Sequence, residues 1–306
     1  MRLVFFGTPH FAVPSLRALL EEGFEVAAVV TQPDRPQGRS RTSLVPPPVK
    51  VVALEEGVPV LQPERPSGPF AAAFADLHPD LAIVVAYGHI LKPEILAIPR
   101  LGMLNVHASL LPALRGAAPI AWAILNGLET TGVSIMQMEA GLDSGPVLHQ
   151  IETEVAADET GGELTERLAE LGAGALVEAL TLVEAGEHTA VPQDHSRATW
   201  APKITRETAR LDWTRDAATL ARTTHAFDPE PGAWARAGDV EVKLFGGRVA
   251  NASGEPGTVL AAGETLTIAA KIGALEVSEV QPSGKKRMPV SSWVHGRGVV
   301  VGQRFA

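Results

Sequence analysis

Three polar side chains near the middle of the chain are of the types that acyl-transfer chemistry needs. Asn105 and His107 follow an apolar run and are two residues apart, so on a strand their side chains leave the same face. Asp143 lies in a second polar turn, Gly141-Leu-Asp-Ser-Gly-Pro146. If the fold brings Asp143 to His107, the Asn105 amide can donate to a developing oxyanion, and the carboxylate can fix the imidazole tautomer and raise its pKa. The set contains no nucleophile.

Each of these residues also has an ordinary structural role. An Asn or His at a strand end commonly caps a turn or satisfies the backbone, and Asp143 between glycines is a common turn residue. Taken singly, each fits the structural role better than the catalytic one. Only the combination favours a site.

A longer series of motifs surrounds these residues: Asn105-Val-His107, Ser109-Leu-Leu-Pro112, Arg115-Gly-Ala-Ala-Pro-Ile120 and Gly141 to Pro146. In this order and spacing they resemble the folate-dependent formyltransferases, and most closely those that act on methionyl-tRNA. The resemblance implies transfer of a formyl group from 10-formyltetrahydrofolate to the α-amine of methionine on initiator tRNA. It implies Asn105, a protonated His107 and Asp143 as the catalytic residues, and it requires no metal.

The composition of the chain is that of a globular protein. Its 306 residues are 45% hydrophobic and 20% charged. The absence of cysteine excludes disulfides, thiolate zinc sites and a cysteine nucleophile. The first residues lack the pattern of a signal peptide, and no apolar run approaches the roughly 18 to 20 residues of a membrane span. We therefore expect a cytoplasmic protein without membrane contact, and nothing in the sequence calls for more than a monomer.

The charge of the chain is unevenly distributed. The net charge is −9, yet residues 1–200 hold 12 Lys and Arg against 24 Asp and Glu, while 201–306 hold 14 against 11. A mildly basic last third can lie along phosphates while the acidic part stays off them. A neutral, solvated surface explains the same surplus equally well.

Strands that alternate with helices predict a mostly parallel, doubly wound α/β sheet. The expected strands include Arg2–Phe6, Glu25–Thr31 and Leu81–Gly88, and further helices are expected at about 117–125 and 159–184. The turn Gly7-Thr-Pro9 predicts a helix start with Thr8 as N-cap. That turn lacks Gly-x-Gly-x-x-Gly spacing, which sets aside a dinucleotide-dependent enzyme.

Two segments are candidates for folate binding. The strand Leu81–Gly88 should be central in the sheet and open on a ligand crevice at its C-terminal end. The resemblance implies backbone contacts from Tyr87 and Gly88 to the pterin, although a plain strand exit fits these residues as well. It further implies that the Ser-Leu-Leu-Pro motif lines the folate, through Ser109, Leu110, Leu111 and Pro112.

A Pro-rich, basic stretch from Gln32 to Pro48 differs from its surroundings. A loop this long in a compact domain is usually functional or disordered, and its composition fits a solvated loop equally well. The resemblance implies that a basic loop here wedges against the acceptor end of the tRNA. Arg39 matches its arginine best, with Arg41 next.

The chain changes character after residue 188. We expect a catalytic domain over 1–188, a linker over 189–205 and a small OB-like β-barrel that binds tRNA over 206–306. Its short strands are expected at 240–245, 257–260, 265–269, 275–280 and 299–302. Lys285 and Lys286 lie in a basic turn usable for phosphate, or simply solvated. This region carries further blocks that resemble the same enzymes, among them Leu211-Asp-Trp213, with Trp200 in place of an expected tyrosine.

Two other functions stay open. A hydrolase or a sugar-amine formyltransferase could use the same Asn105, His107 and Asp143 set, and we expect the Arg39 loop and the C-terminal barrel to separate the tRNA enzyme from them. A protein that binds RNA and keeps a folate fold without activity is the non-catalytic alternative. Release of tetrahydrofolate with an amine acceptor excludes it.

Overall fold

A computed structural model describes residues 1–37 and 43–306. The described chain divides into two compact units. The first consists of residues 1–119, 130–154 and 165–201. The second consists of residues 120–129, 155–164 and 202–306. Each unit is therefore assembled from segments that are separated in the sequence.

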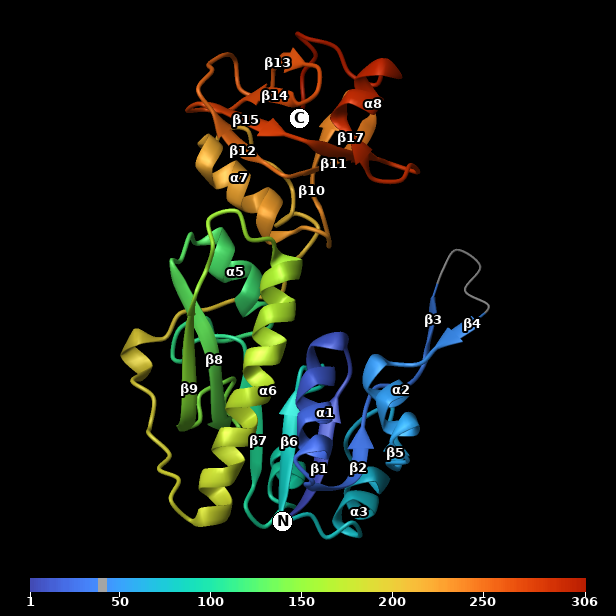
Figure 1. Ribbon diagram of the computed structural model, residues 1–306, viewed down its shortest axis with the longest axis vertical. Coiled ribbons are helices and arrows are strands. Elements are labelled where there is room, and N and C mark those ends of the chain that lie inside the picture. The colour runs from blue at the N-terminus through green and yellow to red at the C-terminus, as the bar shows by residue number, and fades with distance from the viewer. Residues whose placement is uncertain (38–42) are drawn as a thin grey trace. The chain divides into compact units, whose positions relative to one another are not determined.

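The first unit is built on a seven-stranded sheet (Figure 1) with the order β5-β2-β1-β6-β7-β8-β9. Pairing is parallel from β5 to β7 and antiparallel for β8 and β9. The strands are β1 (Arg2–Gly7), β2 (Glu25–Val30), β5 (Val60–Leu61), β6 (Leu81–Val85), β7 (Met103–His107), β8 (Thr130–Gln137) and β9 (Val147–Glu154). The predicted mostly parallel α/β sheet is confirmed.

Helices connect the parallel strands of this unit. They are η1 (His10–Ala12), α1 (Val13–Glu21), α2 (Pro48–Glu55), α3 (Pro69–Ala75) and α4 (Pro93–Leu96). The predicted helices near 117–125 and 159–184 are α5 (Pro119–Leu125) and α6 (Gly161–Ala185). Two short strands, β3 (Arg35–Gln37) and β4 (Ser43–Val45), pair with each other apart from the main sheet.

The sequence of strand β1 is a continuous apolar run because both faces of the strand are buried in the core. Leu3, Val4, Phe5 and Phe6 of β1 are all fully buried, so both faces of the strand are covered. The Phe6 ring meets Phe74 of α3 edge to face, with 5.2 Å between ring centroids. Buried side chains on both faces fix the position of β1 between β2 and β6.

The turn after β1 differs from the prediction. The first helical turn is the 3-10 helix η1, whose N-cap is Pro9 and has no side-chain cap. The Thr8 hydroxyl instead donates to the carbonyl of Tyr87, at 3.0 Å. The expected Thr8 N-cap is wrong because this hydroxyl ties the β1 turn to the end of the neighbouring strand β6.

The second unit contains two antiparallel sheets of four strands. Their orders are β10-β11-β16-β17 and β12-β15-β14-β13. The strands are β10 (Ala233–Ala237), β11 (Val240–Phe245), β12 (Arg248–Ala250), β13 (Val259–Ala262), β14 (Leu266–Ala269), β15 (Ala274–Val277), β16 (Glu279–Pro282) and β17 (Met288–Pro289). Two helices accompany them, α7 (Ala217–Ala226) and α8 (Val290–His295). The sequence predicts a small OB-like β-barrel here, and a small C-terminal β domain of antiparallel strands is confirmed.

Two details of its strands were predicted wrongly. The expected strand 275–280 is two strands, because the chain leaves one sheet at Val277 and joins the other at Glu279. The expected strand 299–302 is irregular and ends in a turn. Apolar residues are frequent in both stretches, and an apolar run does not reveal a change of sheet.

Candidate active site

Strand β7 carries Asn105 and His107 where the sheet changes from parallel to antiparallel pairing. Asn105 lies opposite Val84 of β6 and Met136 of β8, and His107 lies opposite Ser134 of β8. Because side chains alternate along a strand, Asn105 and His107 leave the same face. The Asn105 side chain is half-buried and, within the described part of the chain, its amide makes no hydrogen bond. Over those residues the amide is free to donate and accept, on the face of β7 from which the imidazole also projects.

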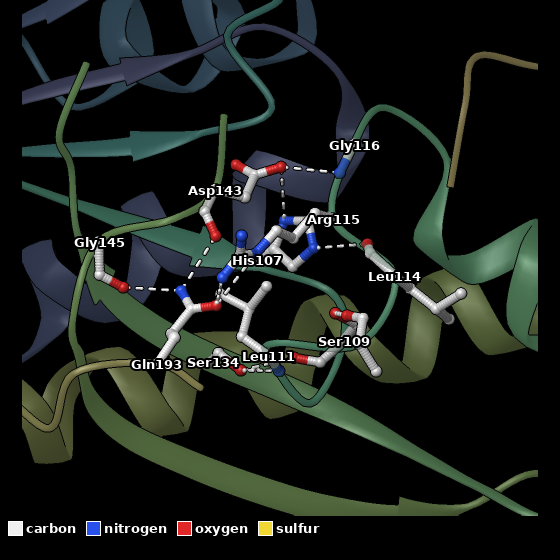
Figure 2. A network of polar contacts seen from close by, with 11 residues as sticks. His107, Ser109, Leu111, Leu114, Arg115, Gly116, Ser134, Asp143, Gly145 and Gln193 are labelled. Atoms are coloured by element: carbon white, nitrogen blue, oxygen red, sulfur yellow. Dashed lines mark hydrogen bonds and ion pairs between the residues drawn. The ribbon is translucent and has the colours of Figure 1, made fainter. Parts of the chain in front are cut away.

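The imidazole of His107 lies between two oxygen acceptors (Figure 2). Its Nε2 atom is 3.0 Å from the carbonyl oxygen of Leu114. Its Nδ1 atom is 3.8 Å from Oδ2 of Asp143. The first distance is a hydrogen bond and puts a proton on Nε2, whereas the second is an ion-pair distance, too long for a direct hydrogen bond. The fold thus brings Asp143 to His107, the condition on which the sequence interpretation depended.

Burial governs the protonation of His107, whose side chain is only 6% exposed. Burial lowers its pKa below the ordinary value of 6.5, and this outweighs the opposing effects of the Asp143 charge and the Leu114 carbonyl. Burial therefore opposes the expected protonation of His107 and favours the neutral ring. The sequence could not show how completely the ring is enclosed.

Asp143 is held in a tight turn. Its φ angle is 48°, in the left-handed region that non-glycine residues rarely occupy. Its Oδ2 atom accepts a hydrogen bond of 2.8 Å from the backbone N–H of Gly116. A Cβ at Gly145 in the same turn would lie 1.9 Å from the carbonyl oxygen of Gln137, so only glycine fits there. The carboxylate is therefore fixed from both the turn and the loop after β7.

A buried pair of side chains lies next to the turn, and no pattern in the sequence indicates it. The Arg115 side chain donates from Nε and Nη2 to Oε1 of Gln193, at 3.1 and 2.6 Å. Gln193 belongs to the stretch expected to be a linker, yet it is only 9% exposed and joins the site (Figure 2). Linker-like composition carries no periodicity, so no sequence signal identified it.

The candidates Tyr87 and Gly88 lie at the end of β6. The Tyr87 side chain is buried, and burial raises its pKa to about 12. The Tyr87 carbonyl accepts hydrogen bonds from Thr8 Oγ1 and Gln32 Nε2, both at 3.0 Å. Gly88 has a φ of 84°. The side chain of Tyr87 thus belongs to the core, and a contact with folate would come from the backbone of this turn.

Hydrogen bonds to Ser134 shape the Ser109–Pro112 candidate segment. The Ser134 hydroxyl donates to the Ser109 carbonyl at 2.6 Å and accepts from the Leu111 N–H at 3.0 Å. Gln150 donates to the carbonyl of Leu111 at 3.0 Å. The Ser109 hydroxyl donates to the Ala113 carbonyl at 2.6 Å. These bonds give the loop a fixed shape beside His107.

Of the four residues expected to contact tRNA, the structure describes two. Arg39 and Arg41 lie outside the described residues. Lys285 and Lys286 are exposed in the turn between β16 and β17. The neighbouring Arg287 is bound by Asp228, with hydrogen bonds of 2.6 and 3.0 Å, and by Glu279. The charge of Arg287 is thus paired with carboxylates, whereas the two lysines form no ion pair within the described residues.

None of the helices in residues 1–37 and 43–306 is long and apolar enough to cross a membrane. Over the same residues, no group of three or more His, Cys, Asp or Glu side chains is placed to hold a metal ion.

Solved structures resemble the whole fold. HypX from Aquifex aeolicus, in a complex with tetrahydrofolic acid, matches 97% of this chain with a TM-score of 0.66 and 24% identity, and this chain spans 47% of HypX. An N-formyltransferase from Helicobacter canadensis, in complex with folinic acid and dTDP-3-aminofucose, matches 94% of this chain and 99% of its own with a TM-score of 0.68 and 14% identity. At these identities the likeness shows the fold alone. The likeness in fold extends over nearly the whole chain.

Sequence relatives are much closer. Residues 1–180 match the formyl transferase family model, and residues 203–298 match the model of the formyl transferase C-terminal domain. A methionyl-tRNA formyltransferase of Citrifermentans bemidjiense is 44% identical over 97% of this chain and 93% of its own length. One from Pseudomonas paraeruginosa is 45% identical over 99% of this chain and all of its own length. The chain belongs to the formyltransferase family, and within it to the methionyl-tRNA formyltransferases.

Proposed function

We propose that this protein transfers the formyl group of 10-formyltetrahydrofolate to the α-amine of methionyl initiator tRNA. A bond forms between the amine nitrogen and the formyl carbon, and the bond from that carbon to N10 of the folate breaks. The amine loses a proton and N10 gains one. The products are N-formylmethionyl-tRNA and tetrahydrofolate, and translation initiation in the cytoplasm is the process that uses the first.

The observation that carries this proposal is the Asn105 amide, which has no hydrogen-bond partner among the described residues. It leaves the same face of β7 as His107, which lies at ion-pair distance from Asp143. As the amine attacks, negative charge develops on the formyl oxygen, which the amide N–H can stabilise. No covalent enzyme intermediate is needed, because holding the amine next to the donor supplies much of the rate gain. The site offers a donor and a proton-transfer pair, which is what this reaction requires.

Burial lowers the pKa of His107 and so favours the unprotonated imidazole, the form that can accept a proton. A neutral imidazole near pH 7 can take the proton that the amine releases, and the adjacent Asp143 carboxylate stabilises the imidazolium that forms. The same proton can then pass to the departing folate nitrogen. This order of events does not depend on a His107 that is charged at the start.

We assign the substrates to separate parts of the chain. The turn of Tyr87 and Gly88 and the segment of Ser109, Leu110, Leu111 and Pro112 are proposed to line the folate. Arg39, Arg41, Lys285 and Lys286 are proposed to contact the tRNA. In this assignment, residues 1–188 carry out catalysis and residues 206–306 bind the tRNA. Residues 189–205 connect the two and supply Gln193 to the site, and the protein acts as a monomer.

A formylation assay tests the proposal. Wild type is expected to formylate methionyl initiator tRNA with 10-formyltetrahydrofolate, and Arg39→Ala to weaken use of the tRNA in a salt-sensitive way. A dTDP-amino sugar serves as the competing acceptor, because the fold match to a sugar enzyme extends over both units. Turnover of the sugar, with no turnover of the tRNA, would contradict the assignment of the acceptor. Donor consumption with neither acceptor would favour a hydrolase.

A further inference from the structure

Gln193 lies at the centre of a hydrogen-bond network that joins three separate segments. It follows helix α6 in the sequence and is 50 residues from Asp143. Its Nε2 atom donates to the carbonyl oxygens of Asp143 and Gly145, at 2.9 and 2.7 Å. Its Oε1 atom accepts both hydrogen bonds from Arg115. Figure 2 shows this amide between the guanidinium and the turn.

These contacts use the whole capacity of the amide. A primary amide has two N–H donors and an oxygen with two lone pairs, and all four are engaged here. The orientation is unambiguous, because a flipped amide would direct its NH₂ at the guanidinium and its oxygen at two carbonyls. Gln193 therefore binds the backbone on both sides of Ser144 and cannot rotate without losing every bond.

Arg115 explains why the residue type matters. Its side chain is buried, 4% exposed, and within the described chain no carboxylate oxygen lies within 4.0 Å of it. Its other partner is Nδ1 of His195, at 2.9 Å. A buried guanidinium would be stabilised best by a carboxylate. A glutamate at position 193 would supply one, but it would set its oxygens against the Asp143 and Gly145 carbonyls.

We propose that Gln193 is a positioning residue for the formyl transfer proposed above, on which this inference rests: its amide locks the Asp143 turn, so that the carboxylate stays beside His107. Asp143 occupies a left-handed backbone conformation that the turn alone does not favour. The two hydrogen bonds from Gln193, together with the Gly116 N–H on the carboxylate, hold it there. Gln193 acts through Asp143 and touches neither substrate in this scheme.

Two substitutions distinguish the hydrogen bonds that Gln193 donates to the Asp143 turn from those that it accepts from Arg115. Gln193→Glu keeps an acceptor for Arg115 and loses both donors to the turn. Gln193→Met keeps a similar length and loses all four hydrogen bonds. Arg197→Ala is the matched control, because Arg197 lies in the same segment, in η2 (His195–Arg197), and is exposed. Thermal unfolding of each purified variant checks that it is folded.

Both Gln193 variants are expected to lower kcat by at least about tenfold, with the KM for 10-formyltetrahydrofolate changed by less than about twofold. Arg197→Ala is expected to match wild type. The NMR titration of His107 provides a readout that does not depend on substrate. Gln193→Met adds no charge, so a fall in the His107 pKa in that variant reports that the Asp143 carboxylate has moved away. If Gln193→Glu does not fold, Gln193→Met decides the question.

A fully active Gln193→Glu variant would overturn the proposal, since its turn has lost both donors. So would an unchanged His107 titration in folded Gln193→Met. Failure of the proposed function looks different: wild type itself would not formylate methionyl-tRNA. In that case the His107 titration alone decides whether Gln193 positions Asp143.

Discussion

The Nδ1 atom of His107 lies 3.8 Å from Oδ2 of Asp143, and the same carboxylate oxygen accepts the N–H of Gly116 at 2.8 Å. The carboxylate is thus oriented by backbone while its charge acts on the imidazole. Burial of the ring lowers the His107 pKa, and the Asp143 charge opposes that effect. The reactivity of the pair depends on the balance between these two influences.

Replacing Asp143 by asparagine should leave burial as the dominant influence on the pKa of His107. Asp143→Asn keeps an oxygen for the Gly116 N–H and removes the charge, so the His107 pKa should fall further below 6.5. Turnover should drop about a hundredfold or more, which is the range of general acid–base catalysis. NMR titration of the imidazole and kcat measured on one preparation test both parts. Near-full activity with an unchanged KM for the folate would remove Asp143 from the mechanism.

Asn105 is the proposed donor to the formyl oxygen. Asn105→Ala should lower kcat about a hundredfold or more, since one oxyanion donor contributes on the order of 3 kcal/mol. Asn105→Asp is the shape-matched comparison: it removes the N–H and adds a negative charge, so its loss should be at least as large. The KM for 10-formyltetrahydrofolate should change far less than kcat, because the interaction belongs to the transition state. A loss confined to KM would instead indicate a residue that binds ground-state folate.

The buried imidazole should also make stability depend on pH. The folded-state pKa of His107 is lowered, so below about pH 6.5 the unfolded chain binds a proton that the folded chain resists. The free energy of unfolding should therefore rise as pH increases through that range and fall on acidification. The test is urea unfolding of wild type and His107→Gln at pH 5.5 and pH 7.5. The change in the free energy of unfolding between the two pH values should be larger in wild type, and the excess is the contribution of His107. An equal pH dependence in the two proteins would mean that His107 adds none.

Much of this site could be predicted from sequence, and the reasons are local. Asn105 and His107 were placed together by strand alternation alone, and the Gly141–Pro146 turn was recognisable from its glycines. The approach of Asp143 to His107 came from the resemblance to known enzymes, since spacing along the chain does not reveal a contact between distant segments. Gln193 was missed for the same reason. The sequence predicts a protonated His107, whereas burial of the ring lowers its pKa. That enclosure depends on Leu114 and on the fold of the whole loop, which the spacing of residues does not show.

A substitution at Gly145 should distort the Asp143 turn without removing any polar side chain. Gly145→Ala would place a Cβ 1.9 Å from the backbone oxygen of Gln137, which cannot move like a flexible side chain. We expect a loss of stability of at least about 1 kcal/mol together with lower turnover. Gly174→Ala in α6 is the matched control, because nothing lies within 4 Å of its new Cβ. Its helix propensity should leave stability unchanged or raise it by up to about 1 kcal/mol.

The exposed lysines of the second unit test where the tRNA is contacted. If Lys285 and Lys286 each neutralise a phosphate, each alanine substitution should reduce the slope of log Kd against log salt by about 1. Affinity should fall with little change in kcat at saturating tRNA, since neither residue belongs to the His107 site. Lys271→Ala is the control, an exposed lysine of the same unit outside this turn. Binding of tRNA measured by fluorescence at several salt concentrations gives the slopes. Equal slopes in all four proteins would show that the turn is only solvated, and the contact would then have to come from another part of the surface.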